Sequence, residues 1–123
     1  MKVLLSIKPE FVERIFSGQK RFEYRKALFK KDVTTVIVYS TMPIGLIVGE
    51  FKVKKIHKDE PTNLWEKTKE YSGVAEVFYN EYFKGRNQGF AIEIFDPLLY
   101  DEPINPKEKF ASFTAPQSFA YLD

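Results

Sequence analysis

GQKRFEYR, residues 18–25, places one ammonium group, two guanidinium groups and a carboxylate in a short segment directly after an expected helix end. A run of charges this dense most often forms a solvated face. Strict strand alternation would put Arg21, Glu23 and Arg25 on one face of a sheet and Lys20 on the other. Lys20 can meet Glu23 only if the strand starts after Lys20. The direction of the Lys20 side chain therefore decides whether these charges form a site.

The segment before this stretch is predicted to be a strand followed by a short helix. Residues 1–7 are apolar enough for a buried strand, and Pro9 suits the first position of a helix, where its missing N–H is not needed. Apolar residues recur at helical spacing as far as Phe16, and Gly18 stands where a left-handed cap is expected. The helix would thus deliver the charged stretch to one rim of the following sheet.

The rest of the chain alternates short strands with few helices. Strands are predicted over residues 34–40, 46–56 and 90–95, and helices over about 62–71 and 74–84. Asp96-Pro97 is expected to end the last strand, residues 98–100 to extend or restart it, and Pro103 and Pro106 to prevent regular structure after that. The apolar tail 116–122 is expected to dock near the first strand.

This pattern favours an α+β fold built as a small mixed β-barrel rather than a doubly wound sheet. The length of 123 residues and the absence of any linker predict a single domain over 1–123. No cysteine is present, and no apolar segment is long enough to span a bilayer, so we expect no disulfide, no metal, no cofactor, no membrane association and a cytoplasmic location.

Net charge is only +2, so the distribution of charge carries more information than its sum. Between residues 20 and 32 six cationic side chains outnumber two carboxylates, and four lysines follow within residues 52–58. Basic clusters of this kind can neutralise phosphates. For residues 52–58 we prefer another interpretation, in which the lysines protect an edge strand from aggregation.

A polar pocket is the main functional hypothesis from the residues themselves. Lys8, Lys20, Glu23 and Arg25 would line it, together with the hydroxyl groups of Ser6, Ser40 and Thr41. Burial lowers the pKa of a lysine and prepares it to act as a base, whereas a neighbouring carboxylate opposes that shift. In the structural alternative, Glu23 is only an ion-pair partner of its neighbouring arginines.

Aromatic residues could supply stacking surfaces, but most are expected in the core. Trp65 with Tyr71, and Phe78 with Tyr82, recur at helical spacing, which is typical of core packing. Tyr24 and Tyr39, beside the charged strand, are better candidates for contact with a base. His57 is the only histidine and is expected to be a surface or structural residue.

Several of these motifs together resemble the ASCH family over the whole chain. They are Ser6-Ile7-Lys8-Pro9-Glu10, Gly18-x-Lys20-x-x-Glu23-x-Arg25, Tyr39-Ser40-Thr41-x-Pro43 and Pro116-Gln117-Ser118-Phe119. The resemblance implies a PUA-like pseudo-barrel flanked by about three short helices, a fold associated with RNA. It also favours a position for Lys20 in the turn, where it can reach Glu23.

Some ASCH-like proteins are amidohydrolases that remove an acyl group from a modified cytosine nucleoside. Gly18, Lys20 and Arg25 match their motif, but Glu23 stands where that subgroup carries a threonine. A carboxylate can activate water as a general base, yet it cannot replace a hydroxyl group in the same role. Glu66 and Glu70 are candidates for the catalytic glutamate of that subgroup, without a motif that aligns them.

We therefore rank an RNA- or nucleotide-binding module first. The ligand would contact Ser6, Lys8, Lys20, Glu23, Arg25, Tyr39, Ser40, Thr41, Gln117 and Ser118. The alternative is an amidohydrolase or other hydrolase acting on a modified nucleoside or on RNA, with Lys20 and Glu23 as catalytic residues. A third hypothesis is a regulatory domain that senses a small ligand through the same pocket.

Overall fold

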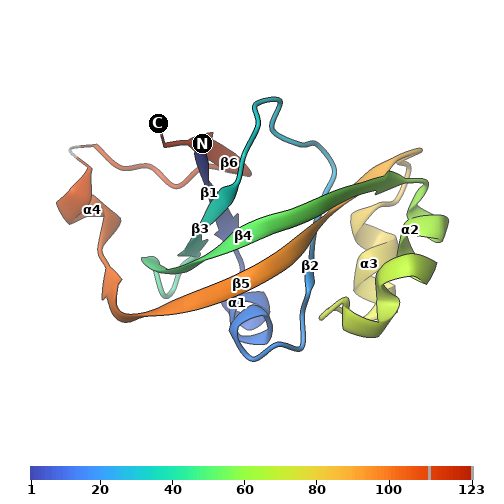
Figure 1. Ribbon diagram of the computed structural model, residues 1–123, viewed down its shortest axis with the longest axis horizontal. Coiled ribbons are helices and arrows are strands. Elements are labelled where there is room, and N and C mark those ends of the chain that lie inside the picture. Colours follow the sequence, from blue (N-terminus) through green and yellow to red (C-terminus); the bar gives the residue numbers. More distant parts are fainter. Residues whose placement is uncertain (111, 123) are drawn as a thin grey trace.

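A single curled sheet of six strands forms the body of the molecule in the computed structural model, which describes residues 1–110 and 112–122 (Figure 1). The strands are β1 (Lys2–Ile7), β2 (Phe22–Arg25), β3 (Thr35–Ser40), β4 (Leu46–Asp59), β5 (Gly89–Ile104) and β6 (Phe119–Tyr121). Their order is β2-β5-β4-β3-β1-β6, with β1 and β3 parallel and the other pairs antiparallel. The sheet therefore ends at β2 on one side and at β6 on the other.

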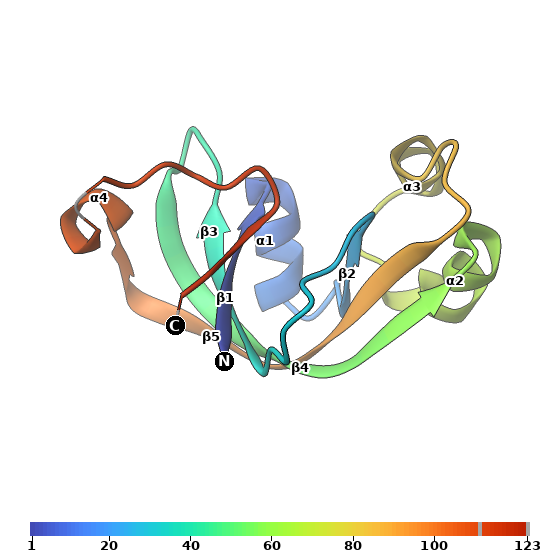
Figure 2. The same cartoon turned by 90° about the horizontal axis from the view of Figure 1, so that it is seen from above.

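The curvature of the sheet comes mainly from its two long central strands, β4 and β5. Three shifts of register interrupt the ladder between them, and shifts of this kind bend and twist a strand pair. Figure 2 shows the result, an open trough in which β2 faces β1 across the concave side. This half-barrel confirms the predicted α+β fold and the small mixed barrel of PUA-like type.

Four short α-helices and one 3-10 turn accompany the described strands, where about three helices are expected. They are α1 (Pro9–Phe16), α2 (Pro61–Thr68), η1 (Lys69–Tyr71), α3 (Glu76–Tyr82) and α4 (Pro106–Lys109). Proline stands in the first turn of α1, α2 and α4, where no N–H is required. The predicted left-handed cap after α1 is confirmed, because Gly18 has a φ of +87°. α2 and α3 lie together at one end of the molecule (Figure 1).

Two boundaries in the last third of the chain differ from the sequence prediction. β5 continues through Asp96-Pro97 to Ile104, and Pro106 begins a short helix instead of preventing regular structure. β2 pairs with β5 only from Phe90 to Glu93, so beyond that point one edge of β5 is free of β2. At such an edge no neighbouring strand requires a backbone N–H, so the missing N–H of proline costs no hydrogen bond. Pro97 and Pro103 are accommodated there for this reason.

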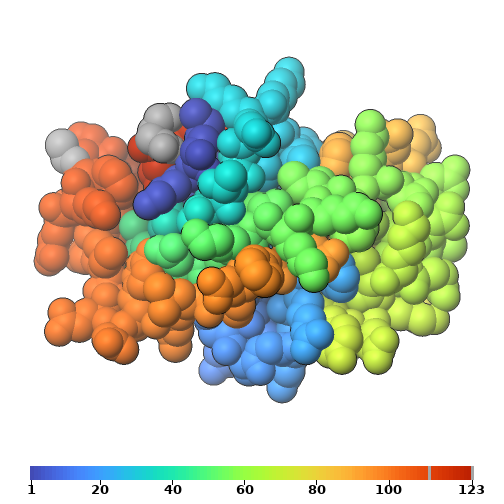
Figure 3. All heavy atoms as spheres, viewed as in Figure 1, coloured from blue at the N-terminus to red at the C-terminus, as the bar shows by residue number. Residues whose placement is uncertain are grey.

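The prediction that residues 52–58 form an edge strand is wrong. β4 lies between β3 and β5, in the interior of the sheet order. Its lysines are nevertheless exposed, at positions 52, 54, 55 and 58. Figure 3 shows the side chains of β4 (green) and β5 (orange) uncovered on one face of the molecule. An alternation of lysines with apolar residues therefore marks the solvent face of a central strand here.

The apolar core has three parts: one on the concave side of the sheet, one at the end beneath α2 and α3, and one around Leu4, Ile37 and Ile47 on the other face of β1, β3 and β4. All six residues of β3 are buried, as predicted for a central strand. Val12 and Ile15 of α1 pack against apolar residues of β1, β3 and β4. Tyr79 and Leu64 of the helical end pack against Tyr24 of β2 in a second cluster. None of the described helices is long and apolar enough to cross a bilayer.

Candidate functional site

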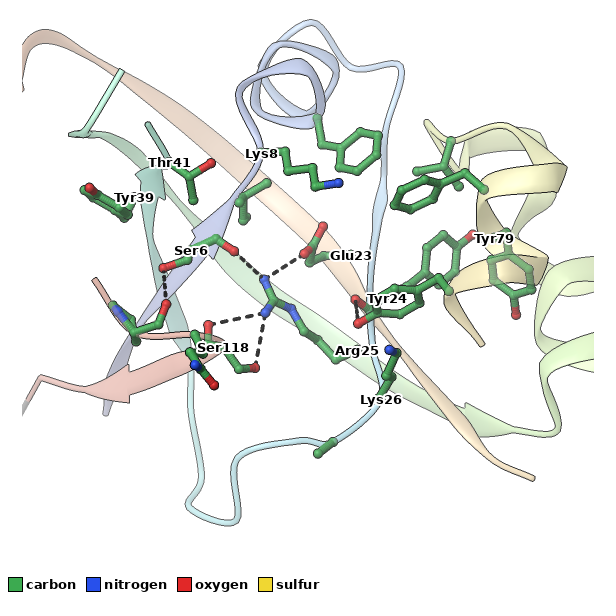
Figure 4. Close-up of a pocket in the computed structure, with 18 of the residues that line it drawn as sticks. Ser6, Lys8, Glu23, Tyr24, Arg25, Lys26, Tyr39, Thr41, Tyr79 and Ser118 are labelled. Carbon is green, nitrogen blue, oxygen red and sulfur yellow. Dashed lines mark hydrogen bonds and ion pairs between the residues drawn. The ribbon is translucent and has the colours of Figure 1, made fainter. Parts of the chain in front are cut away.

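A cavity of about 1050 Å³ lies between the two ends of the curled sheet (Figure 4). β1, α1, β2, α3 and the tail segment 115–118 form its walls. Nine of the ten predicted site residues line it: Ser6, Lys8, Lys20, Glu23, Arg25, Tyr39, Thr41, Gln117 and Ser118. Ser40 is buried and is not one of the lining residues. Its neighbours Tyr39 and Thr41 take the cavity side, as alternation along a strand requires.

Lys20 lies in the turn between α1 and β2, which resolves the direction of its side chain. Its ammonium group donates a hydrogen bond to the carbonyl oxygen of Ser72 at 2.9 Å and lies 3.8 Å from Glu23 Oε1. Its stem passes Gly73, where a Cβ would come within 2.3 Å of Lys20 Cβ. Gly73 also has a φ of +68°, so two constraints favour glycine at this position.

Burial is the main electrostatic influence on Lys20, which is only 2% exposed. It lowers the pKa of Lys20 to about 8, against the opposing effect of the Glu23 carboxylate. Arg25 and Arg14 add a smaller lowering. Lys20 is therefore a cation at neutral pH that can release its proton more easily than an exposed lysine.

Glu23 and Arg25 point to the same side of β2, as their spacing predicts. Arg25 Nη2 donates to Glu23 Oε2 at 2.9 Å, and both side chains are more than nine-tenths buried. Glu23 thus holds a cation near each of its two carboxylate oxygens. Of the two arginines in the ion-pair alternative, Arg25 pairs with Glu23, whereas the Arg21 guanidinium lies over the Tyr71 ring.

Arg25 also joins the two ends of the sheet. Its guanidinium donates to the carbonyl oxygen of Ser6 on β1 at 3.0 Å, and to the carbonyl and hydroxyl oxygens of Ser118 at 3.3 and 3.2 Å (Figure 4). The Ser6 hydroxyl donates to the carbonyl oxygen of Pro116 at 2.7 Å. The expected docking of the tail near the first strand is thereby confirmed. Arg25 Nε is the one buried side-chain nitrogen or oxygen of the described residues that has no hydrogen-bond partner.

Cations exceed carboxylates in the cavity lining by five to two. The cations are Lys8, Lys20, Arg25, Lys26 and Arg86, and the carboxylates are Glu23 and Glu81. Because Glu23 is engaged by Lys20 and Arg25, the exposed cations Lys8, Lys26 and Arg86 dominate the rim. The site is therefore complementary to an anionic ligand.

The aromatic lining differs from the sequence prediction. Tyr24 and Tyr39 reach the cavity, but they are only 7% and 5% exposed. The Tyr24 ring packs edge-on against Tyr79, its hydroxyl group bonds Thr68 Oγ1 at 2.7 Å, and burial raises its pKa to about 12. Tyr39 packs against Phe113.

Phe78 and Tyr82, in contrast, are half-buried and line the cavity. Phe11 of α1 joins them. The expected core position is wrong for Phe78 and right in part for Tyr82, which also packs against the second core cluster. Helical spacing alone does not distinguish a side chain in the core from one that faces a cavity, so the sequence holds no signal for these residues beyond their recurrence on α3.

Other candidate residues lie elsewhere. His57 bonds Glu93 at 2.8 Å and does not line the cavity. Glu66 and Glu70 are exposed residues of α2 and η1, also outside the cavity lining. Among the residues that the structure describes, no three His, Cys, Asp or Glu side chains are grouped so as to hold a metal ion.

A curled half-barrel with a polar cavity between its two ends defines a PUA-like domain. Comparison of the sequence with protein families gives a match to the ASCH domain over residues 5–101. The chain belongs to the ASCH family.

Relatives in Zymomonas mobilis resemble the chain over nearly its whole length. An ASCH domain-containing ribonuclease of that organism is 30% identical over 129 residues, covering 98% of this chain and 84% of the relative. The crystal structure of ASCH from Zymomonas mobilis matches with a TM-score of 0.92 at 27% identity, covering 99% of this chain and 87% of that one. Crystal structures of two variants of the Zymomonas protein, one tyrosine-to-phenylalanine and one serine-to-alanine, match equally well, with TM-scores of 0.92.

More distant matches cover a smaller part of the other protein or share only the fold. ATP synthase subunit alpha of Ureaplasma parvum is 29% identical over 98% of this chain, which corresponds to 15% of that protein. The N-terminal domain of Staphylothermus marinus McrB has a TM-score of 0.54 at 10% identity, a likeness of fold alone.

Proposed function

We propose that this protein binds RNA in the cavity between the two ends of its sheet. One observation carries the proposal: a cavity just above the roughly 300–1,000 Å³ usual for ligand sites has an excess of cations and half-buried aromatic rings in its lining. Cations bind the phosphates of RNA, and aromatic rings stack on its unpaired bases. The similarity to a protein named as a ribonuclease supports RNA as the ligand.

Lys8, Lys26 and Arg86 are the groups that would meet phosphates. All three are exposed at the cavity, so their charged groups can reach a phosphate backbone. Arg25 has a different role, because four of its hydrogen bonds already join β1, β2 and the tail. It keeps the cavity walls in place, and its side chain positions Glu23 and Ser118.

Cleavage of the bound RNA is the second candidate function. Two observations favour it: the lowered pKa of Lys20, to about 8, beside the Glu23 carboxylate, and the name of the Zymomonas relative. In such a reaction the 2′-hydroxyl group gives its proton to a base, for which the Glu23 carboxylate lies in the cavity beside Lys20, and its oxygen bonds to phosphorus. The bond from phosphorus to the 5′ oxygen breaks, and that oxygen takes up a proton from an acid. Lys20 is the cavity side chain best suited to supply the proton and to stabilise the extra negative charge.

An amidohydrolase has less support from the geometry. Glu66 and Glu70, the candidates for its catalytic glutamate, lie outside the cavity lining. Glu23 occupies the position of the subgroup's threonine and is bound to Arg25. The site therefore lacks the hydroxyl group at that position which the acyl-removing subgroup carries.

Binding and cleavage can be measured on the same RNA. Fluorescence anisotropy of a short labelled RNA, over a series of salt concentrations, should show affinity that falls with salt. The double variant Lys8→Ala/Lys26→Ala should reduce the slope of log affinity against log salt by about 1 per lysine, whereas Lys52→Ala/Lys55→Ala on the outer face of β4 should not. Equal losses in both double variants would contradict the cavity as the binding site.

Cleavage is followed on denaturing gels with the same RNA. Turnover that disappears in Lys20→Met while binding persists would support the second function. If the unaltered protein binds the RNA without cleaving it, the binding function is supported and the nuclease function is contradicted.

A further inference from the structure

Phe78 and Tyr82 form a parallel pair of rings on the cavity side of α3. Their centroids lie 6.2 Å apart and their planes differ by 11°. Phe11 packs edge-on against Phe78, with centroids 5.1 Å apart, and the Tyr82 hydroxyl donates to the carbonyl oxygen of Tyr24 at 3.2 Å. The pair is therefore held from two sides, and yet both rings are only half-buried.

The ammonium group of an exposed lysine lies over each ring of the pair. Lys8 Nζ lies 5.2 Å from the centroid of Phe78, and Lys26 Nζ lies 4.7 Å from the centroid of Tyr82. Cation–π contacts at exposed sites are weak, so a better partner for the ring can replace the lysine. The two lysines approach from different elements, Lys8 from the end of β1 and Lys26 from the end of β2.

We infer that Phe78 and Tyr82 are a stacking platform for two consecutive bases of single-stranded RNA, and that Lys8 and Lys26 bind the phosphates beside those bases. The inference rests on the proposed RNA-binding function and names the form of RNA that the site takes. Each base replaces an ammonium group on a ring, and the released ammonium group lies next to the phosphate that enters with the base.

The geometry favours single strands over duplexes. In a duplex the faces of the bases are covered by their neighbours, whereas unpaired bases can be splayed onto aromatic side chains. The cavity volume of about 1050 Å³ leaves room for more than one nucleotide. Because every base has a π face, this platform tolerates different sequences, and the site should discriminate strand state more than sequence.

Variants of α3 test the platform. Phe78→Leu and Tyr82→Leu keep an apolar side chain but remove the ring, and each should weaken binding of a single-stranded RNA about tenfold. Tyr82→Phe, which keeps the ring, should bind as the unaltered protein does. Val77→Ala is the matched control on the same helix, because Val77 is 78% exposed and is not a cavity residue.

Abasic RNA separates stacking from phosphate contact. An oligonucleotide with two adjacent abasic sites at its centre keeps all its phosphates, so it should bind the unaltered protein about as weakly as intact RNA binds the double variant Phe78→Leu/Tyr82→Leu. The losses should not add when the two changes are combined, since both remove the same contact. Thermal unfolding checks that each variant is folded.

Three outcomes are distinguishable. The platform is supported if affinity falls in the ring variants and with abasic RNA, and if the two losses do not add when they are combined. If Phe78→Leu, Tyr82→Leu and abasic RNA all keep the salt-sensitive affinity that the unaltered protein has for intact RNA, the platform is overturned but the proposed RNA binding stands. No binding of any RNA by the unaltered protein overturns both.

Discussion

Lys20 is a charged side chain held almost entirely out of water, and its contacts explain how. Its ammonium group donates a hydrogen bond to the Ser72 carbonyl oxygen and forms an ion pair with the Glu23 carboxylate. The ring centroids of Tyr24 and Phe11 lie 4.9 and 5.4 Å from Lys20 Nζ. Together these groups replace part of the lost hydration. The lowered pKa shows that the replacement is incomplete.

The burial of Lys20 predicts a pH dependence of stability. Its pKa is about 8 in the folded state against 10.5 ordinarily, so the unfolded chain binds the proton more tightly. The free energy of unfolding should therefore rise with pH from about 8 toward 10.5, by up to roughly 3 kcal/mol. Lys20→Met should remove this rise. Urea unfolding of both proteins between about pH 7.5 and pH 9.5 measures it, below the range where tyrosines ionise.

Equal pH profiles for Lys20→Met and the unaltered protein would contradict the burial of a charged Lys20. The comparison between the two proteins also separates the effect of Lys20 from that of Tyr24, whose pKa is raised to about 12. Above pH 10 the unfolded chain loses the Tyr24 proton before the folded protein does, so stability then falls.

At the scale of elements, the turn around Gly73 fixes Lys20 against β2. Gly73→Ala would place a methyl group 2.3 Å from Lys20 Cβ at a φ of +68°. Gly85→Ala is the matched control, because Gly85 has a φ of +77° and no heavy atom within 4 Å of an added Cβ. We expect Gly85→Ala to cost about 1–2 kcal/mol of unfolding free energy and Gly73→Ala clearly more. Equal losses in urea unfolding would show that the contact with Lys20 can relax.

The docking of the tail depends on Arg25, which joins β1, β2 and Ser118. Arg25→Lys keeps the charge but cannot reach three partners with one ammonium group. Hydrogen exchange should become at least tenfold faster at the amide of Ser6, which donates to the Ser118 carbonyl oxygen. Arg14→Lys, whose bond is to Gly73 on the other side of the cavity, should leave the Ser6 amide unchanged. Unchanged exchange in Arg25→Lys would mean that β6 holds the tail alone.

The sequence predicted elements well where local chemistry decides them. Pro9 and Gly18 mark the ends of α1, and the β-branched run of β3 marks a buried strand. The prediction from sequence was wrong where a neighbouring strand determines the structure. Pro97 is tolerated because β2 stops short of it, and the lysines of β4 belong to a central strand because β5 pairs along them. Such partners lie far away in the chain, and no local pattern names them.

At the scale of the whole molecule, the curled sheet brings its own ends together. Residues near positions 6, 23 and 118 meet across a gap that Arg25 closes. The charged members of the site were predictable because their motif places them together. Phe78 and Tyr82 were not, since only the packing of α3 beside the opening turns them toward the cavity.

Two basic surfaces compete as the place of the proposed RNA binding: the cavity, and the lysines on the outer face of β4. An NMR titration of the 15N-labelled protein with a short single-stranded RNA distinguishes them directly. The account predicts that the amide signals which move belong to the cavity walls, around Lys8, Lys26, Phe78 and Ser118. Shifts confined to residues 52–58, with the cavity signals unmoved, would contradict it.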